Sequence, residues 1–452
     1  MSTQGIRACA LHALAIVSCA CVSTEQREHY AALRDRLVAA PPAASAAALD
    51  PLEHSPELSR SALVELVLAR NPGIDAARAA ARAALARWPQ ESALPDPMFG
   101  YGLRPQSLAS SEVHPGNDFE LSQGLPFPGK LELRGERALS EADAAESGLA
   151  LERVRLASVT SIAFDEYWLS ERARETNAHQ RALLAHAREV ALSRYAAGTG
   201  EQHDALAAET EQAMLEHRAI ELDVERSVAV ERINVLLDRP PQLELPPPPL
   251  DLEPPAEESN LDVATLVARA LERRPELRAL QAEVRARESE VAIARRDFLP
   301  DFTVRAGYDS TWQEVPLRPL VGFELNLPLQ LERRRAALEE ADAQLAREKS
   351  RLRRLENEVS LQVTVALQRL HESRHLLELS ESRLVPVARA RESSARAAFS
   401  AGRIAFIELT EAERALTSAD QSVFEARAAF SRRVAELAKA VGNLAGAPDT
   451  EP

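Results

Sequence analysis

The chain has 452 residues, of which 45% are apolar, 27% charged and only 4% aromatic, and its 69 acidic and 54 basic side chains leave a net charge of −15. The apolar share excludes wholesale disorder, and the acidic excess argues against a protein that mainly coats nucleic acid. Sixteen glycines are few for a long all-β chain, whereas Ala, Leu, Arg and Glu dominate, which predicts long helices. All three cysteines precede residue 22, so the body contains neither a disulfide framework nor a cysteine metal cluster.

The N-terminal segment has the features of an export signal. Residues 1–18 combine a thin positive start at Arg7 with a short apolar core, too short to span a membrane. The tetrapeptide IVSC that ends at Cys19 resembles a bacterial lipobox, which predicts acylation of that thiol, with Cys21 as a competing acceptor. A plain cleaved signal is the alternative. Residues 19–56 are then predicted to be a lipidated linker, and because one acyl anchor binds weakly, a second membrane contact is expected.

The rest of the chain repeats itself at an offset of roughly 204 residues, far longer than the periods of solenoid repeats. The matching segments are Arg70-Asn71-Pro72 with Arg273-Arg274-Pro275, Leu94-Pro95-Asp96 with Leu299-Pro300-Asp301, Phe119-Glu120-Leu121 with Phe323-Glu324-Leu325, and Tyr195-Ala196-Ala197-Gly198 with Phe399-Ser400-Ala401-Gly402. Four matches in one order predict two tandem repeats, residues 57–238 and 257–442. The proline-rich connector, residues 239–256, is predicted to be a stiff extended bridge, and residues 443–452 form a tail.

Each repeat contains two segments with strand-type alternation of apolar and polar side chains. The predicted strands are about residues 97–104, 118–125, 301–308 and 320–328. One face is apolar or aromatic and the other polar or small, as in a strand with lipid outside and water inside, so Phe302, Val304 and Phe323 are predicted to face lipid. A half-buried sheet in a soluble protein alternates in the same way. Four strands cannot close a barrel and lipid does not tolerate open edges, so the membrane interpretation requires oligomers.

Each repeat also contains a very long predicted helix, from about Leu131 to Tyr195 and from about Leu331 to Phe399. The second carries leucine, valine and alanine at spacings of three, four and seven, as a coiled-coil seam requires. These seam residues are Leu345, Leu352, Leu355, Val359, Val363, Ala366 and Leu370. At 1.5 Å per residue such a helix is on the order of 100 Å long, which is unlike a compact enzyme. Pro386 is expected to bend it.

Tandem halves, two strand pairs, two very long helices and a lipobox together resemble the TolC-like outer membrane efflux family, over residues 57–442. The most specific pieces are RYAAGTGEQHDAL (194–206) and AFSAGRIAFIELTEAE (398–413). The segment FELSQGLPFPGKLELRGERA (119–138) looks like the branch associated with cobalt–zinc–cadmium or copper resistance. The corresponding exit in the second repeat, residues 327–341, lacks the Pro-Gly-Lys element, so metal ions and drugs both remain candidate cargoes.

The resemblance implies a mainly α fold, with a long coiled-coil α-helical barrel plus a small transmembrane β-barrel of four strands per chain and twelve per homotrimer. It implies an outer membrane channel of a tripartite efflux system, a passive exit duct that docks to a periplasmic adaptor (membrane fusion) protein and an RND-type inner membrane pump. No cofactor, no enzymatic activity and no nucleic acid partner are expected. A periplasmic coiled-coil scaffold without a pore is the alternative.

Gly198 and Gly402 each stand where one helix ends and another begins, which predicts left-handed helix caps. The resemblance implies that these turns form the periplasmic tip of the tunnel. The family's gate also uses a tyrosine and an arginine, whereas this chain has Phe399 and Ile404 at those positions. A phenylalanine cannot donate a hydroxyl hydrogen bond and an isoleucine cannot pair with a carboxylate, so the closed state must be held differently.

Three acidic residues near these turns, Asp204, Glu408 and Glu411, match acidic positions at the family's tunnel entrance. The spacing of three places Glu408 and Glu411 on one helix face. Two interpretations remain open for these residues. They form an acidic ring at the entrance, or they only complement the helix macrodipole as acids in early helical turns do.

Residues His371 to His375 read HESRH and match the HExxH pattern of zinc proteases, with both histidines on one helix face. The segment lies inside the predicted coiled coil, without strands to form a cleft and without an identifiable third ligand. Solvated or inter-helix histidines are therefore the favoured interpretation. A zinc hydrolase is the less favoured alternative, and no metal or catalytic residue is predicted.

Overall fold

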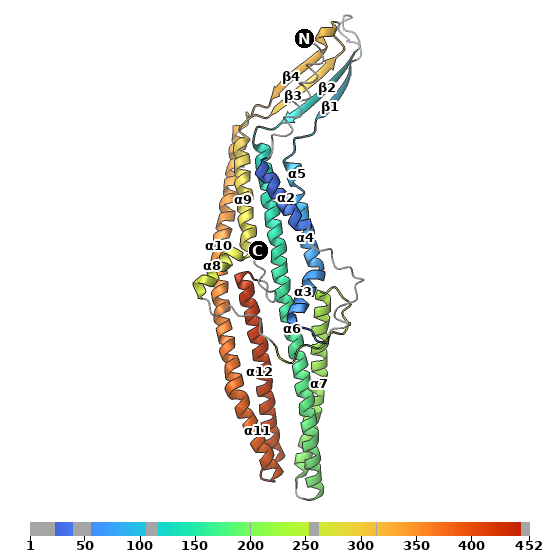
Figure 1. Ribbon diagram of the computed structural model, residues 1–452, viewed down its shortest axis with the longest axis vertical. Coiled ribbons are helices and arrows are strands. Elements are labelled where there is room, and N and C mark those ends of the chain that lie inside the picture. Colours follow the sequence, from blue (N-terminus) through green and yellow to red (C-terminus); the bar gives the residue numbers. More distant parts are fainter. Residues whose placement is uncertain are drawn as a thin grey trace. The chain divides into compact units, whose positions relative to one another are not determined.

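The computed structural model describes residues 23–38, 56–104, 116–198, 200–252, 262–312 and 314–443 (Figure 1). Cys19, Cys21 and the rest of the signal segment lie outside the described residues, so the anchor stays a prediction. The described chain is mainly helical with one small antiparallel sheet, which confirms the predicted fold class.

The two sequence repeats fold into the same order of elements. The first contains α3 (Arg60–Arg70), α4 (Pro72–Leu85), α5 (Trp88–Glu91), β1 (Met98–Arg104), β2 (Gly116–Leu125), α6 (Lys130–Ala196) and α7 (Gln202–Leu236). The second contains α8 (Val263–Arg273), α9 (Pro275–Arg296), β3 (Phe302–Asp309), the 3-10 turn η1 (Val315–Leu317), β4 (Pro319–Leu325), α10 (Leu331–Leu379), the π-helical turn η2 (Ser380–Leu384), α11 (Val385–Ser400) and α12 (Phe406–Val441). Ser59 and Asp262 cap α3 and α8 with their side chains, and a proline stands two residues after the last residue of each helix.

The compact units of the structure are not the two repeats. Unit 1 comprises residues 1–40, 77–149 and 276–355, and unit 2 comprises residues 41–76, 150–275 and 356–452. Each unit therefore takes segments from both repeats, and α6 and α10 each contribute one part to each unit. The duplication is seen in the order of elements along the chain, whereas each compact unit combines equivalent segments of both repeats.

The sheet of unit 1 has the strand order β1-β2-β3-β4, with every pair antiparallel (Figure 1). The central β2–β3 pair joins a strand of the first repeat to a strand of the second. The strands lie at the predicted positions with shifted ends: β2 begins at Gly116, and β4 ends at Leu325, short of the predicted residue 328. The Asn326 amide still bonds to the Asp301 carbonyl at 3.0 Å, in line with the β3–β4 register, and Pro328 has no amide hydrogen with which to extend the ladder further.

Part of the predicted N-terminal linker is instead a docked helix, α2 (Thr24–Val38), which corrects the prediction for these residues. Leu33 and Leu37, four residues apart, share one face of α2 and are almost fully buried. Tyr30 stacks on Trp88 with ring centroids 4.5 Å apart. The linker interpretation overlooked this short apolar stripe.

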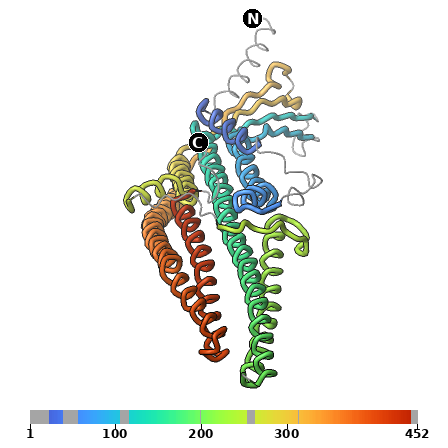
Figure 2. Tube along the Cα trace, turned by 60° about the horizontal axis from the view of Figure 1, so that its bottom comes forward, coloured from blue at the N-terminus to red at the C-terminus, as the bar shows by residue number. Residues whose placement is uncertain are grey.

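Unit 2 contains antiparallel helix pairs, α6 with α7 and α11 with α12 (Figure 2). The seam residues Val359, Val363 and Leu370 are completely buried, as the heptad spacing predicts. The predicted single helix to Phe399 is interrupted by η2, directly before Pro386. Proline lacks the amide hydrogen for the α-helical ladder and clashes with the preceding turn, and the wider π turn accommodates both effects.

Over its described residues, 239–252, the proline-rich connector forms turns and irregular structure rather than helix or strand, and side chains of α6 hold it in place. The Tyr167 hydroxyl donates to the Pro246 carbonyl at 3.1 Å, and the Trp168 indole donates to the Pro249 carbonyl at 2.9 Å. Prolines supply carbonyls without amide hydrogens, so a proline-rich segment is a natural acceptor for these aromatic donors.

Candidate functional site: a one-sided sheet and a helical tip

The sheet places most of its apolar side chains on one face, with Gln123, opposite Val304, as a polar exception on that face. Its register places Tyr101 opposite Phe119, Phe119 opposite Tyr308, and Val304 opposite Phe323, so all these side chains share one face. Phe302 and Phe323 pack on this same face with ring centroids 5.5 Å apart. The face is solvent-accessible in the single chain, where Phe323 is 65% exposed. A large exposed apolar face marks a surface made to contact lipid or another protein.

The opposite face of the sheet carries glycines and an ion-pair network that crosses all four strands. Arg305 on β3 pairs with Glu120 on β2 and with Glu324 on β4. Nearer the strand ends, Arg104 on β1 lies 3.6 Å from Asp118 and 3.2 Å from Asp309. Each arginine thus faces two carboxylates, so each of the two groups carries a net negative charge.

The chain leaves the sheet through a buried junction that links the two repeats. The Lys130 ammonium is only 3% exposed and lies 3.0 Å from Asp297 and 3.0 Å from Asp301, a contact set called here the junction lock. Asp301 also accepts from the Phe127 amide at 2.8 Å. The Pro-Gly-Lys element of the first repeat therefore meets the Leu-Pro-Asp element of the second. Gly129 adopts a φ of +82° here, a conformation that favours glycine.

The helical tip in unit 2 contains the two predicted glycine turns. Gly198 and Gly402 have φ values of +71° and +70°, which confirms their left-handed conformation. After α11 the Arg403 amide bonds to the Ala398 carbonyl and the Gly402 amide to the Phe399 carbonyl, both at 2.9 Å. These two bonds form a Schellman cap and satisfy carbonyls that the helix end leaves unpaired.

A small apolar core and a cation–π contact hold the two helix pairs together at this tip. The core consists of Leu184, Ala187, Ala208, Phe399, Phe406 and Leu409. The Arg194 guanidinium lies 4.5 Å from the Phe399 ring centroid and donates to the Phe399 carbonyl at 2.7 Å, a contact called here the tip clamp. Phenylalanine at position 399 is thus a core residue under an arginine, and Ile404 packs partly buried against the same core.

The three acidic candidates lie at the start of the helices that follow the turns. Asp204 and Glu408 are in the first turns of α7 and α12. Glu408 and Glu411 are exposed, and Asp204 is half-buried. The neighbouring Glu413 is less accessible, and burial raises the pKa of its carboxyl. Both interpretations, the acidic ring and the macrodipole, are compatible with these positions.

A buried ion pair, not predicted from the sequence, joins α3, α6 and α12 in unit 2. The Arg60 guanidinium donates to Asp165, which is 1% exposed, and also lies 5.5 Å from the Phe164 ring centroid. Ser431 lies 3.4 Å from the same carboxylate. Burial raises the pKa of the Asp165 carboxyl to about 6, against the opposing pull of Arg60.

The HExxH segment does not form a metal site in the described structure. His371, Glu372 and His375 are exposed on α10, and His375 lies 3.6 Å from Glu378. Within the described ranges, no three His, Cys, Asp or Glu side chains come together in a way that could hold a metal ion. Among the described helices, none is both long and apolar enough to cross a bilayer.

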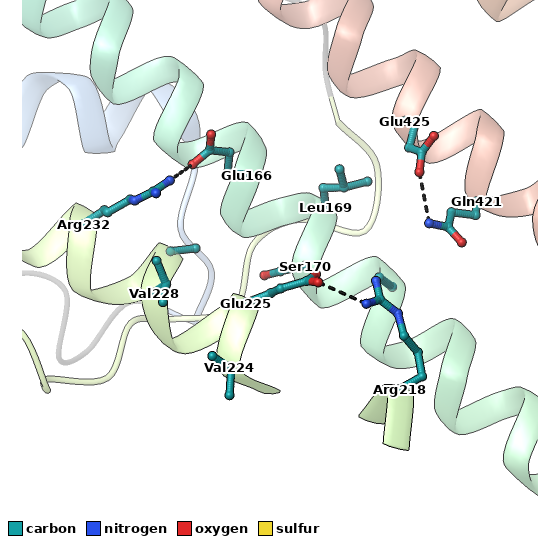
Figure 3. A pocket seen from close by; sticks show the side chains of 12 residues that line it. Glu166, Leu169, Ser170, Arg218, Val224, Glu225, Val228, Arg232, Gln421 and Glu425 are labelled. Carbon is teal, nitrogen blue, oxygen red and sulfur yellow. Dashed lines mark hydrogen bonds and ion pairs between the residues drawn. The ribbon is translucent and has the colours of Figure 1, made fainter. Parts of the chain in front are cut away.

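A groove of about 450 Å³ lies among α6, α7 and α12 (Figure 3). Its charged lining is engaged in contacts within the chain: Arg232 donates to Glu166 at 2.8 Å, and Arg218 to Glu225 at 3.1 Å. The remaining lining is largely aliphatic, including Leu169, Val224 and Val228. Such a lining is typical of a seam between helices and offers no evident chemistry for a ligand.

A family model matches the sequence of the second repeat. Residues 266–443 match the family model described as outer membrane efflux protein. The match confirms the resemblance that the sequence motifs indicated, including the turn at Gly402.

Solved outer membrane channels have the same fold as nearly the whole chain. The outer-membrane channel OprN is 21% identical with a TM-score of 0.73, and the alignment covers 89% of this chain and 97% of OprN. CusC, studied for folding and transmembrane channel formation, is 15% identical with a TM-score of 0.73 over 89% of this chain and 97% of its own. The outer membrane protein VceC from Vibrio cholerae is 18% identical with a TM-score of 0.71, covering 85% of this chain and 96% of VceC. At these identities the likeness shows the fold. The comparison with curated proteins finds no match.

Proposed function

We propose that this protein is the outer membrane channel component of a tripartite efflux system, a passive exit duct for heavy-metal cations or small toxic molecules. The observation that carries the proposal is the one-sided sheet, with an exposed apolar face, an ion-paired polar face and two open edges. A closed ring of such sheets satisfies its backbone, places the apolar face in lipid and encloses the polar face as a pore lining. The efflux domain at residues 266–443 supports the same conclusion.

The proposal includes a homotrimer, because four strands per chain give twelve in three copies, enough to close a barrel. Long antiparallel helices then extend into the periplasm and end at the tip turns, Gly198 and Gly402. There the chain docks to a periplasmic adaptor and an RND-type inner membrane pump, which supplies the energy. In the trimer Asp204, Glu408 and Glu411 form an acidic ring at the entrance, which favours cations. The Pro-Gly-Lys exit at residues 128–130 favours metal cations as cargo.

The proposal also includes a lipid anchor at Cys19. Acylation there holds the N-terminus at the outer membrane, and the barrel is the second contact that a single lipid-modified residue needs. In cells grown with labelled palmitate, the wild type should incorporate label and Cys19→Ser should not. Label that persists in Cys19→Ser and disappears in Cys21→Ser would assign the anchor to the second cysteine.

The experiment that tests the channel is conductance of the purified protein in planar lipid bilayers, combined with its mass in detergent. The wild type should be trimeric and should conduct. Val304→Asp places a charge on the apolar face, costing up to about 2 kcal/mol per copy in the membrane, and should block insertion. Thr303→Asp, the adjacent residue on the polar face, is the matched control and should insert and conduct.

Equal insertion of the two variants would show that the apolar face does not contact lipid. A protein that remains soluble and monomeric after removal of the lipid anchor, without conductance, would favour the periplasmic scaffold over the channel. Because Val304 and Thr303 are neighbours on the same strand, a general effect on folding should appear in both variants.

A further inference from the structure

We propose that the start of α10 binds anionic phospholipid headgroups at the periplasmic edge of the proposed barrel. The surface that binds them, called here the exit surface, follows β4 directly (Figure 1). It comprises the exposed side chains of Leu327, Leu329, Leu331, Arg333 and Arg335. The inference rests on the proposed channel, because that function places the end of β4 at a membrane boundary.

The apolar part of the exit surface continues the apolar face of the sheet. Leu325 belongs to that face, since it lies opposite Phe302 in the strand register. The alternation continues past the end of β4 into Leu327 and Leu329, which are 61% and 82% exposed. Apolar side chains at the end of a lipid-facing strand are suited to the boundary between headgroups and acyl chains, where they leave water.

The charged part of the exit surface lies in the first turns of α10. Arg333 and Arg335 stand within about 6 Å of the helix start along its axis, and helical side chains lean toward the N-terminus, here toward the sheet. Among the described residues, the Arg333 side chain has no hydrogen-bond or ion-pair partner. Arg335 pairs with Glu332 at 2.6 Å, but both side chains are largely exposed, so this pair contributes little. Arginines in the first turns of a helix also oppose its dipole, so they do not stabilise α10.

Arg334 fixes the position of this helix start. Its guanidinium donates to the Asp297 carbonyl at 2.7 Å and to the Gln330 carbonyl at 3.3 Å. The chain after α9 is thus tied to the start of α10. Arg333 and Arg335 are each about 100° away from Arg334 around the helix, so they lie on either side of this contact and stay exposed.

The corresponding helix start in the first repeat is covered, and it has one arginine where α10 has three. Both helix starts contain Leu-Glu, and this match aligns Arg335 with Gly135. A Cβ at Gly135 would lie 2.8 Å from the Gln26 side chain of α2 and 3.2 Å from the Trp88 indole. The start of α6 is therefore packed under α2, whereas Leu331 at the start of α10 is 47% exposed. An arginine at this place needs the open surroundings that the second repeat provides.

Phospholipid headgroups match both parts of the exit surface. The planar guanidinium of arginine binds phosphate oxygens in pairs, and the leucines beside it reach hydrocarbon at the same boundary. A basic cluster next to a membrane-embedded segment gains roughly fivefold in affinity for anionic lipid with each arginine. Free inorganic phosphate would satisfy the arginines but would leave the leucines in water.

Native mass spectrometry of the full-length protein, titrated with phosphatidylglycerol in detergent, tests this site. The wild type should bind one lipid per copy first, and Arg333→Gln/Arg335→Gln should bind it about 25-fold more weakly. Arg353→Gln/Arg354→Gln is the matched control, because these exposed arginines stand about 30 Å further along α10, and its affinity should equal that of the wild type. Leu329→Gln changes no charge and should weaken binding severalfold.

Equal affinity of Arg333→Gln/Arg335→Gln and the wild type, in protein of trimeric mass that conducts, would overturn the lipid site and leave the channel intact. A similar loss in the control variant would also overturn it, because net charge alone would then explain the binding. Inorganic phosphate that displaces the lipid at equal concentration would identify a simple anion site instead. Loss of trimeric mass in the variant would assign the exit surface to a contact between copies. A wild-type protein of monomeric mass without conductance would refute the proposed function.

Discussion

The buried pair Arg60–Asp165 predicts how the stability of the protein depends on pH, and the burial of Asp165 sets the direction of that dependence. An aspartate beside an arginine ordinarily titrates below its usual range, but here burial outweighs that attraction and raises the pKa of Asp165 from 3.8 to about 6. Arg60, Ser431 and Arg432 all favour the ionised form, and their combined effect is still smaller than the cost of desolvation. Ionisation of Asp165 is thus less favourable in the folded protein than in the unfolded chain.

The pH dependence follows from linkage. Between pH 3.8 and about 6 the folded state holds a proton on Asp165 that the unfolded state has released, so this group adds stability as pH falls through about 6. The contribution is absent near pH 7.5 and reaches about 2 kcal/mol near pH 4, at 1.36 kcal/mol for each unit of pKa difference. For a chain of this size that amounts to a shift of about 2 °C in the unfolding temperature.

The measurement compares thermal unfolding of the wild type and Asp165→Asn in detergent from pH 4 to pH 7.5. Asparagine keeps the shape of the side chain and cannot ionise, so other titrating groups cancel in the difference. On acidification the unfolding temperature of the wild type should rise by about 2 °C relative to that of the variant. Glu221→Gln, at a surface carboxylate whose pKa is lowered by Arg218, is the control and should shift in the opposite direction or not at all. A wild-type advantage that stays constant or grows with rising pH would refute the reasoning.

Two further predictions concern the junction lock and the acidic ring. Lys130→Met leaves Asp297 and Asp301 without their buried cation and should destabilise the protein by roughly 2 kcal/mol. The control Lys349→Met breaks an exposed ion pair with Glu288 and should cost less than about 1 kcal/mol. Thermal unfolding of the two variants measures the difference in stability. The double variant Glu408→Gln/Glu411→Gln should lose cation preference in planar bilayers, mainly at low salt because a molar salt solution screens charges beyond about 3 Å. If selectivity is unchanged while thermal stability falls, these residues serve the helix macrodipole alone.

Periodicity alone predicts much of this fold. The alternation of Phe302 and Val304 with their polar neighbours marks β3, and the spacing of Val359, Val363 and Leu370 marks the buried seam of α10. The glycine turns were also predictable, because few residues other than glycine adopt φ near +70°. These features depend on local backbone geometry, so the residue pattern of a short segment is enough to predict them.

Contacts between distant segments were not predictable in the same way. Asp165 and Arg60 are separated by 105 residues, and nothing near either one marks its partner. Lys130 stands out in the sequence as part of the Pro-Gly-Lys element, but its contact with Asp301 depends on the pairing of β2 with β3. For α2 a local signal existed, in Leu33 and Leu37 four residues apart, and the helix was missed because that stripe is short.

The two repeats share a fold but not the contacts that hold it. Lys130 of the junction lock, Arg194 of the tip clamp and Arg60 of the buried pair all belong to the first repeat. At the corresponding places the second repeat has a shortened exit after β4, Ala398 and Val263. Duplication therefore supplies the shape, and basic residues of one repeat reinforce contacts within the chain.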